Sequence, residues 1–399
     1  MTTAFPASPA HIEKTSFSII LAASFCHLLN DIMQSLLTSI YPLLKDNYQL
    51  DFVQIGLLTA AFQVTASLLQ PVIGLVTDRW HIPFSLPAGM ASTFFGLMFL
   101  AFAHSFPMLV LGACLIGFGS AVFHPESSRI ARHASGGRHG MAQSFFQVGG
   151  NTGHAVGPLL AAFIVLPFGQ QSLAWFGVIA IVGMMVLTWI SRWYEGQRRL
   201  HAGRAPVSRE LPLPRGRVAW ALGVLVLLTA TKNVYLASIS SYFTFYTIGR
   251  FGLSVQEAQM MLFLFLGASA VGVFLGGPIG DRYGTRFVIW FSILGVIPFA
   301  LMLPYADLFW TGVLTVMIGF IFSSAFSAIV VFAQELVPGR VGLIAGVFFG
   351  FAFGAGGLGA AVLGVVADRQ GIDFVYTICS YLPLLGILTV LLPQLPGRR

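Results

Sequence analysis

The chain alternates long apolar runs with short polar segments. Twelve runs of about twenty residues or more are each long enough to cross a hydrocarbon core of roughly 30 Å as a helix. The predicted spans are 17–44, 52–76, 84–103, 107–130, 140–166, 172–194, 217–248, 255–280, 286–304, 308–336, 341–366 and 374–393. The sequence therefore predicts an all-α membrane protein with twelve transmembrane helices.

Composition agrees with lipid as the solvent. The 399 residues are 56% hydrophobic and 9% charged, whereas soluble domains carry about 25% charged residues. The sequence contains no phosphate-binding G-x-x-x-x-G-K-[ST] loop and no His or Cys group at metal-ligand spacing. We therefore expect no enzyme activity, no cofactor and no metal, and an ion gradient, most simply of protons, as the energy source.

The formal net charge of +7 is an orientation signal rather than a nucleic-acid footprint. With the N-terminus inside, seventeen of the 21 Lys and Arg residues fall on the cytoplasmic side, only Lys45, Arg250 and Arg369 fall outside, and Lys232 lies within a span. This bias follows the positive-inside rule. It predicts a multi-pass protein of the bacterial inner membrane with both termini in the cytoplasm.

A polar stretch divides the chain into two related halves. We expect a cytoplasmic tail at 1–16, a six-helix bundle at 17–194, a cytoplasmic linker at 195–216 and a second six-helix bundle at 217–399. The halves repeat local patterns: GRHG at 137–140 returns as GRVG at 339–342, and an Asp-Arg pair follows both the second and the eighth span. Repeats of this kind predict two pseudo-symmetric bundles with the solute site between them.

Two opposite charges lie near the middle of equivalent spans. Asp31 and Lys232 are 201 residues apart, and an ionisable group at membrane depth must face a cavity or a partner. We expect both to face the central cavity and to pair there, either during transport or as a static bridge. His27 shares a helix face with Asp31. Tyr235 and Tyr242 share the face of Lys232, as donors to an anion or as core residues.

The spans at 107–130 and 140–166 add further polar groups. Histidine is the residue type that titrates near physiological pH, and burial can raise the pKa of a glutamate towards it, so we expect His124 and Glu126 to serve proton coupling together with Asp31. An internal ion pair between Glu126 and Arg129 is the alternative. Gln147 and Asn151 follow helical spacing and form either a hydrogen-bonding wall for the solute or contacts between helices.

Two motifs predict a gating role. The segment at 277–286 resembles the signature loop of the major facilitator superfamily, with a partial copy at 74–80. The resemblance implies that charged residues form a cytoplasmic latch, with a tight turn as the alternative; they are Asp78, Arg79, Asp281, Arg282 and Arg286. A small-residue ridge is similar to an antiporter motif of that superfamily, with helix packing as the alternative. Its members are Gly153, Gly157 and Pro158.

Several blocks resemble the fosmidomycin resistance protein family, a branch of that superfamily. The most specific are residues 26–31, 123–129 and 147–151. The resemblance implies export of fosmidomycin, an anionic phosphonate bearing a hydroxamate, in exchange for protons. His27, Lys232 and His124 would then bind the anion. A broader multidrug exporter and a proton-coupled importer of an organic anion or sugar are the alternatives. The expected partners are this small anion, protons and lipid, without nucleic acid, and the protein is expected to be a monomer.

Overall fold

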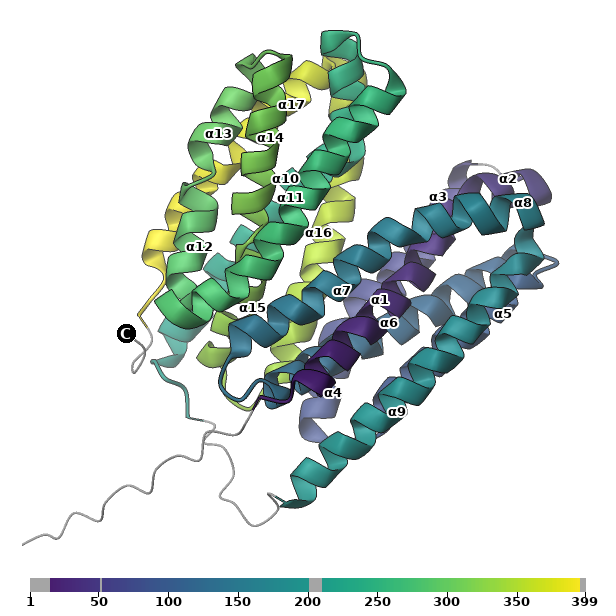
Figure 1. The fold of residues 1–399 in the computed structure, drawn as a ribbon, viewed down its shortest axis with the longest axis vertical. Coiled ribbons are helices and arrows are strands. Elements are labelled where there is room, and N and C mark those ends of the chain that lie inside the picture. The colour runs from purple at the N-terminus through teal and green to yellow at the C-terminus, as the bar shows by residue number, and fades with distance from the viewer. Residues whose placement is uncertain (1–14, 51, 201–209, 395–399) are drawn as a thin grey trace, which may run out of the picture.

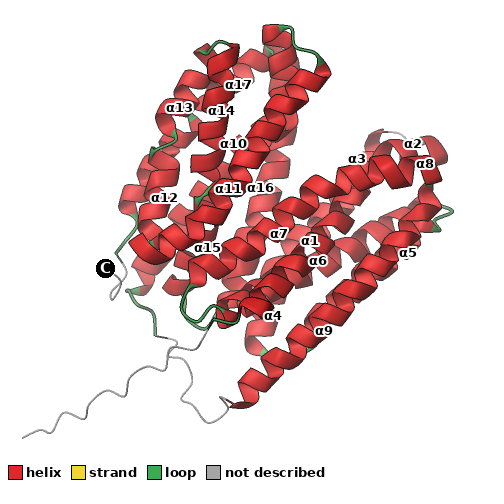
Figure 2. Cartoon of the chain, in the orientation of Figure 1, coloured by secondary structure: helices red, strands yellow, loops and turns green. Residues whose placement is uncertain are grey.

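The computed structural model describes residues 15–50, 52–200 and 210–394, and every regular element in these residues is helical (Figure 2). The N-terminal half comprises α1 (Phe17–Ser39), α2 (Tyr41–Tyr48), α3 (Phe52–Gln63), η1 (Val64–Leu68), α4 (Leu69–Arg79), α5 (Ser85–Ala101), α6 (Phe106–Ala134), α7 (His139–Leu160), η2 (Ala161–Val165), α8 (Leu166–Phe168), η3 (Gln170–Phe176) and α9 (Gly177–Leu200). The C-terminal half comprises α10 (Arg215–Phe251), α11 (Val255–Tyr283), α12 (Thr285–Leu294), α13 (Ile297–Met302), η4 (Leu303–Tyr305), α14 (Leu308–Ser323), α15 (Ala325–Leu336), α16 (Val341–Gln370), α17 (Ile372–Ser380) and η5 (Leu382–Leu391).

The predicted membrane helices are present. Within the described residues, eleven helical stretches are long and apolar enough to cross a membrane, and the 17-residue α5 is a further apolar helix. Helix α9 runs to Leu200 and α10 begins at Arg215, so both enter the predicted linker. Most of the predicted tail and the middle of the linker lie outside the described residues.

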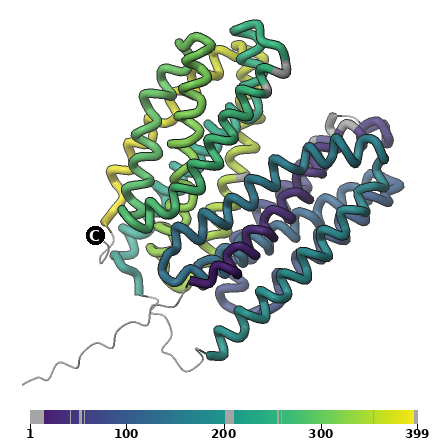
Figure 3. Tube along the Cα trace, viewed as in Figure 1, coloured from purple at the N-terminus to yellow at the C-terminus, as the bar shows by residue number. Residues whose placement is uncertain are grey.

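The two halves form separate helix groups that meet at one end and diverge at the other (Figures 1 and 3). They meet near the end of α9 and the start of α10, which we call the linker end. There α16 packs on α4 and α6, and α11 packs on α7. Ala345 and Phe349 of α16 belong to the apolar core of the N-terminal half. The bundles are therefore joined through side chains at the linker end.

Glycines let the backbones touch where the bundles meet. A Cβ on Gly74 of α4 would collide with the carbonyl of Gly342 on α16, and a Cβ on Gly277 of α11 would collide with that of Gly140 on α7. The two contacts are related by the sequence repeat, because Gly74 matches Gly277 and Gly140 matches Gly342. A side chain at Gly74, Gly140 or Gly277 would push the bundles apart at the linker end, and one at Gly342 would displace the side chain of Arg129.

Large apolar side chains cover the outside of both bundles. Phe163 is 75% exposed, and Leu68 and Phe245 are both 66% exposed. In water such a surface would favour aggregation, but in a bilayer it contacts acyl chains of matching polarity. The polar side chains that the sequence places within the spans are therefore the unusual feature, and most of them lie inside the bundles.

Candidate functional site

The carboxylate of Asp31 is the centre of a buried polar cluster in the N-terminal bundle. It is 2% exposed and lies on α1. Its Oδ1 accepts hydrogen bonds from the side-chain amides of Asn30 and Gln34, both at 2.9 Å. Its Oδ2 lies 2.9 Å from Nδ1 of His154 on α7 and 3.2 Å from Nε2 of His27. These four contacts compensate its desolvation, as a buried charge requires.

Two imidazoles meet beside this carboxylate. Nε2 of His27 lies 3.3 Å from Nε2 of His124 on α6, which in turn lies 3.8 Å from Oδ1 of Asp31. The ring of His27 stacks on Phe146 of α7, with ring centroids 4.1 Å apart. Both imidazoles are buried. The structure thus brings together His27, Asp31 and His124, which the sequence analysis assigned to solute and proton binding.

Small residues on α7 make this cluster possible. A Cβ on Gly153 would collide with the backbone carbonyl of Leu28 on α1, and one on Gly157 would collide with the hydroxyl of Ser35. The predicted antiporter ridge therefore packs against α1 within its own bundle. Pro158 ends the ridge and is followed by the widened helical turn of η2, as expected where a proline removes a backbone donor.

Glu126 belongs to a chain of charged side chains that begins on α6, on the C-terminal side of His124. Its Oε1 lies 2.8 Å from Nη1 of Arg129, one turn later on α6, and Ser85 donates to its Oε2 at 3.3 Å. Nη2 of Arg129 lies 2.6 Å from Asp78 and also donates to the hydroxyl of Thr77 at 2.9 Å. The alternative of an internal pair with Arg129 is the arrangement seen in this conformation.

Two aspartates cap helices of the opposite bundle. Asp78 of α4 accepts from the backbone N–H groups of Gly342 at 3.1 Å and Leu343 at 2.7 Å, in the first turn of α16. Asp281 of α11 accepts from those of Gly140 at 2.9 Å and Met141 at 2.8 Å, in the first turn of α7. A carboxylate stabilises a helix N-terminus because the first N–H groups lack partners within the helix. We call these two contacts the interbundle caps.

The three arginines of the predicted latch contact aromatic side chains that are close to them in the sequence. Each guanidinium rests on a neighbouring aromatic ring, at 4.5 to 5.3 Å from the ring centroid. The pairs are Arg79 with Trp80, Arg282 with Tyr283 and Arg286 with Trp290. The acids, rather than these bases, connect the bundles.

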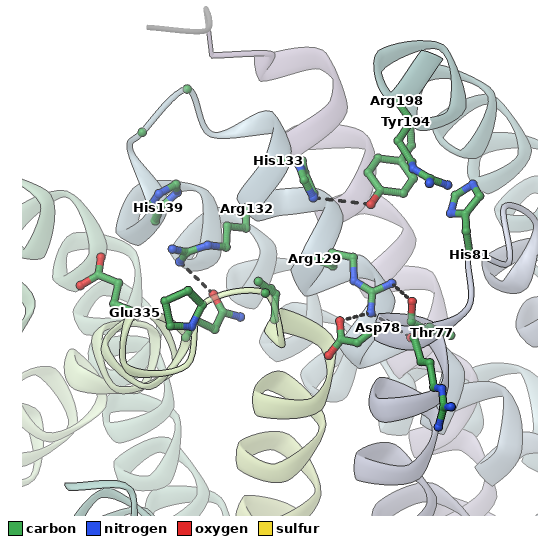
Figure 4. Close-up of a pocket in the computed structure, with 17 residues that line it drawn as sticks. Thr77, Asp78, His81, Arg129, Arg132, His133, His139, Tyr194, Arg198 and Glu335 are labelled. Carbon is green, nitrogen blue, oxygen red and sulfur yellow. Dashed lines mark hydrogen bonds and ion pairs between the residues drawn. The ribbon is translucent and has the colours of Figure 1, made fainter. Parts of the chain in front are cut away.

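A cavity of about 890 Å³ lies at the linker end (Figure 4). Residues of α4, α6, α9 and α15 line it, so both bundles contribute. Its wall includes four arginines and three histidines but only two acids, Asp78 and Glu335. Arg132 extends across it and donates to the side chain of Gln334 on α15 at 3.1 Å. Positive charge therefore dominates this side of the junction.

Lys232 does not face Asp31. Its ammonium group donates to Ser292 of α12 at 2.8 Å and to the backbone carbonyl of Phe322 on α14, and it lies 4.3 Å from the centroid of the Phe322 ring. All three partner groups belong to the C-terminal bundle. The prediction that the two charges pair across a shared cavity is wrong for this conformation. The reason is that Asp31 and Lys232 each point into their own bundle and find their partners there.

The remaining predicted contact residues fall into two groups. Gln147 and Asn151 are half-buried on α7, and Oε1 of Gln147 has no partner among the described residues. Tyr235 is buried against Phe322 in the core of the C-terminal bundle. The hydroxyl of Tyr242 donates to the backbone carbonyl of Ala360 on α16 at 2.6 Å. The two tyrosines are thus engaged within their own bundle, as the core alternative predicts.

Two members of the cluster around Asp31 are not among the predicted site residues. His154 contacts Asp31 directly, although its side chain is 47% exposed, and Gln34 helps to hold the same carboxylate. Both had a signal in the sequence: Gln147, Asn151 and His154 share one helix face, and Gln34 follows Asp31 by three residues.

Comparisons with known proteins agree with this architecture. A family model described as Major Facilitator Superfamily matches residues 23–361 and 235–398. The chain is 58% identical to the fosmidomycin resistance protein of Escherichia coli (strain K12), over 96% of this chain and 94% of that protein. It is 38% identical to the uncharacterized MFS-type transporter YfnC of Bacillus subtilis (strain 168), over 99% and 98%.

The fold also resembles a solved structure. The crystal structure of the major facilitator superfamily transporter FucP in the outward conformation matches with a TM-score of 0.73 at 14% identity, covering 95% of this chain and 99% of that one. Two helix bundles around buried polar groups define a multi-pass membrane transporter of small molecules rather than an enzyme. The chain belongs to the fosmidomycin resistance protein family of the major facilitator superfamily.

Proposed function

We propose that this chain exports fosmidomycin, or a related small anionic antibiotic, across the bacterial inner membrane in exchange for protons. The observation that carries the proposal is its 58% identity to the fosmidomycin resistance protein over nearly the whole of both chains. A transporter of this fold works by alternating access, in which the two bundles rock about a fixed central site. Neither bundle contains nucleotide-binding machinery in its sequence, which favours an ion gradient as the energy source.

The proposed proton-binding groups are Asp31, His124 and Glu126. Asp31 supports this assignment best, because a buried carboxylate in contact with imidazoles can bind and release a proton without leaving the bundle. The proposed solute contacts are His27, His124, Gln147 and Asn151. Lys232, Tyr235 and Tyr242 join them only in a conformation that turns them out of the C-terminal bundle.

The proposed orientation places the linker end and both termini in the cytoplasm. The excess of Lys and Arg on that side supports it. On this orientation the interbundle caps close the cytoplasmic side, and the conformation faces outward. The bundles, proposed as 17–194 and 217–399, act as the moving units, with Asp78, Asp281 and the neighbouring arginines at the gate. The glycine ridge on α7 keeps α1 and α7 together as they move. We propose that one chain is sufficient for transport.

The test is drug tolerance of an efflux-deficient bacterial host, combined with flux in vesicles. We expect expression of the chain to raise tolerance to fosmidomycin, and an imposed pH gradient to drive fosmidomycin flux in purified vesicles. Asp31→Asn should abolish both effects, while Asp46→Asn, the same change at an exposed position of α2, should not. Protection against many cationic dyes would instead indicate a multidrug exporter. Gradient-driven uptake of an organic anion or sugar without drug protection would indicate an importer.

A further inference from the structure

The tautomers of His27 and His124 are fixed by backbone carbonyls. Nδ1 of His27 lies 2.7 Å from the carbonyl oxygen of Phe146, and Nδ1 of His124 lies 3.0 Å from that of Ser120. A carbonyl oxygen only accepts, so each Nδ1 carries the proton and donates it. In each neutral ring the lone pair is therefore on Nε2, and these are the two nitrogens that lie 3.3 Å apart.

Three ligand atoms thus converge on one point. The two Nε2 lone pairs and a carboxylate oxygen of Asp31 all lie within 4.8 Å of one another. Lone pairs and a carboxylate repel each other at such distances, and a single positive charge between them turns every repulsion into an attraction. A proton can take that position, and so can a metal ion.

The distances match those of a metal site. Ligands held about 2.0–2.1 Å from a tetrahedral zinc ion lie about 3.3 Å from one another. Here Nε2 of His27 lies 3.3 Å from Nε2 of His124 and 3.2 Å from Oδ2 of Asp31. Nδ1 of His154 lies 2.9 Å from the same Oδ2 and is the candidate for a fourth ligand. Little movement is needed to place an ion between His27, Asp31 and His124, whereas His154 lies outside this close group and must shift to join it.

The surroundings also resemble those of protein metal sites. Metal-bound histidines usually donate their second N–H to a backbone carbonyl or a carboxylate, which fixes the ring and its tautomer. His27 and His124 both make this contact, and the amides of Asn30 and Gln34 hold Asp31 in place. His154 is the exposed member of the cluster.

We propose that His27, Asp31, His124 and His154 form a binding site for a divalent transition-metal ion, with Zn²⁺ as its representative. Three imidazoles and one carboxylate suit Zn²⁺ and its neighbours in the first transition row, whereas Mg²⁺ and Ca²⁺ require oxygen ligands. Binding itself follows from the geometry alone. Its consequence for transport rests on the proposed function: the ion occupies the position of the transported proton and inhibits proton-driven flux.

The direct test is equilibrium dialysis of the purified, tag-free full chain in lipid nanodiscs against Zn²⁺, with Mg²⁺ as the negative control. We expect one Zn²⁺ and no Mg²⁺ per chain. His27→Gln and His124→Gln each remove a ligand. Each should weaken Zn²⁺ binding by about 10–100-fold or more, since loss of an outer-shell partner alone typically has that effect. His104→Gln, at an exposed loop position, should bind as the unchanged chain does. Zn²⁺ binding that is absent, or equal in all four proteins, would overturn the proposal.

A second measurement needs no variant in this cluster and so remains decisive if those proteins do not fold. Co²⁺ bound to the unchanged chain should give the intense visible absorption of a tetrahedral site, and Zn²⁺ should displace it. Zn²⁺ should also raise the unfolding temperature, because it binds the folded state. A Co²⁺ spectrum identical to that of the ion in buffer, with no thermal shift from Zn²⁺, would mean that only a proton occupies this position.

Measuring fosmidomycin flux together with Zn²⁺ binding distinguishes a failure of this proposal from a failure of the proposed function. Zn²⁺ binding by a chain that transports no fosmidomycin would remove the proposed function and retain the metal site. Gradient-driven fosmidomycin flux in a chain that binds no Zn²⁺ would remove the metal site and retain the proposed function. If both hold, Zn²⁺ should inhibit flux, and a chelator should restore it.

Discussion

Asp31 and Lys232 occupy equivalent positions in the two bundles but have very different surroundings. Asp31 contacts two amides and two imidazoles on α1 and α7. The ammonium of Lys232 contacts a hydroxyl, a backbone carbonyl and a phenyl ring. The N-terminal bundle therefore gathers groups that can exchange protons, whereas the C-terminal bundle surrounds its charge with neutral acceptors. Duplication preserved the helix positions without preserving the chemistry inside them.

Removing the charge of Asp31 should have the largest effect on transport. Asparagine keeps the shape of the side chain but cannot bind and release a proton. Because loss of a positioned proton-transfer group typically costs about 100-fold or more, we expect gradient-driven fosmidomycin flux of Asp31→Asn to fall by at least about that factor. Drug exchange without a pH gradient should fall much less. Flux in vesicles measures both quantities, and equal losses in the two assays would contradict a role in proton coupling.

Replacing Lys232 should reduce transport less than replacing Asp31 does. It should leave the stability of the folded protein unchanged or raise it. Methionine has a similar volume and needs no partner for a charge. Replacing a buried charge by a well-packed apolar group is often neutral or stabilising by about 1–4 kcal/mol. We therefore expect Lys232→Met to unfold at the same or a higher temperature than the unchanged chain.

Asp31→Leu provides the contrast to that variant. It leaves the amides of Asn30 and Gln34 without their acceptor, so it should unfold at a lower temperature. Thermal unfolding in detergent compares the two proteins directly. A large loss of stability in Lys232→Met would show that the ammonium holds α10, α12 and α14 together, and the comparison between the bundles would then need revision.

The fold was predictable because membrane thickness sets the length of every apolar run. The members of the polar cluster were also visible, since His27 and Asp31 lie one helical turn apart on α1. Their encounter with His124 and His154 was not, because spacing within one helix does not show which faces of different helices meet. Lys232 illustrates the same limit: an offset of 201 residues fixes its height in the membrane but not the direction in which α10 points it.

The interbundle caps offer a second comparison between the halves. Asp78 accepts two backbone N–H groups of α16, and Asp281 accepts two backbone N–H groups of α7. Replacing a capping side chain by alanine typically costs about 0.5–2 kcal/mol, and Asp→Asn, which keeps one acceptor oxygen but loses the second acceptor and the charge, should cost less. Both Asp78→Asn and Asp281→Asn should therefore shift the population away from the conformation closed at the linker end.

Spin-label distances measure that shift. Labels at Gly196 on α9 and Tyr283 on α11 lie on opposite bundles near the linker end. In a background without the three native cysteines, the distance between labels should lengthen in both Asp78→Asn and Asp281→Asn. Asp46→Asn serves as the control, because its carboxylate is exposed on α2. An unchanged distance in both variants would show that the interbundle caps do not hold the closed state.

The smallest expected effect comes from Tyr242, on the same helix as Lys232. Its hydroxyl donates to the carbonyl of Ala360 on α16, so Tyr242→Phe removes one hydrogen bond between α10 and α16, worth about 0.5–1.5 kcal/mol. We expect slightly lower thermal stability and little change in the KM for fosmidomycin, since in this conformation the hydroxyl is directed at the backbone of its own bundle. A rise in KM without loss of stability would show that α10 turns during transport and presents Tyr242 to the anion. Lys232 would then be expected to turn with it out of the C-terminal bundle.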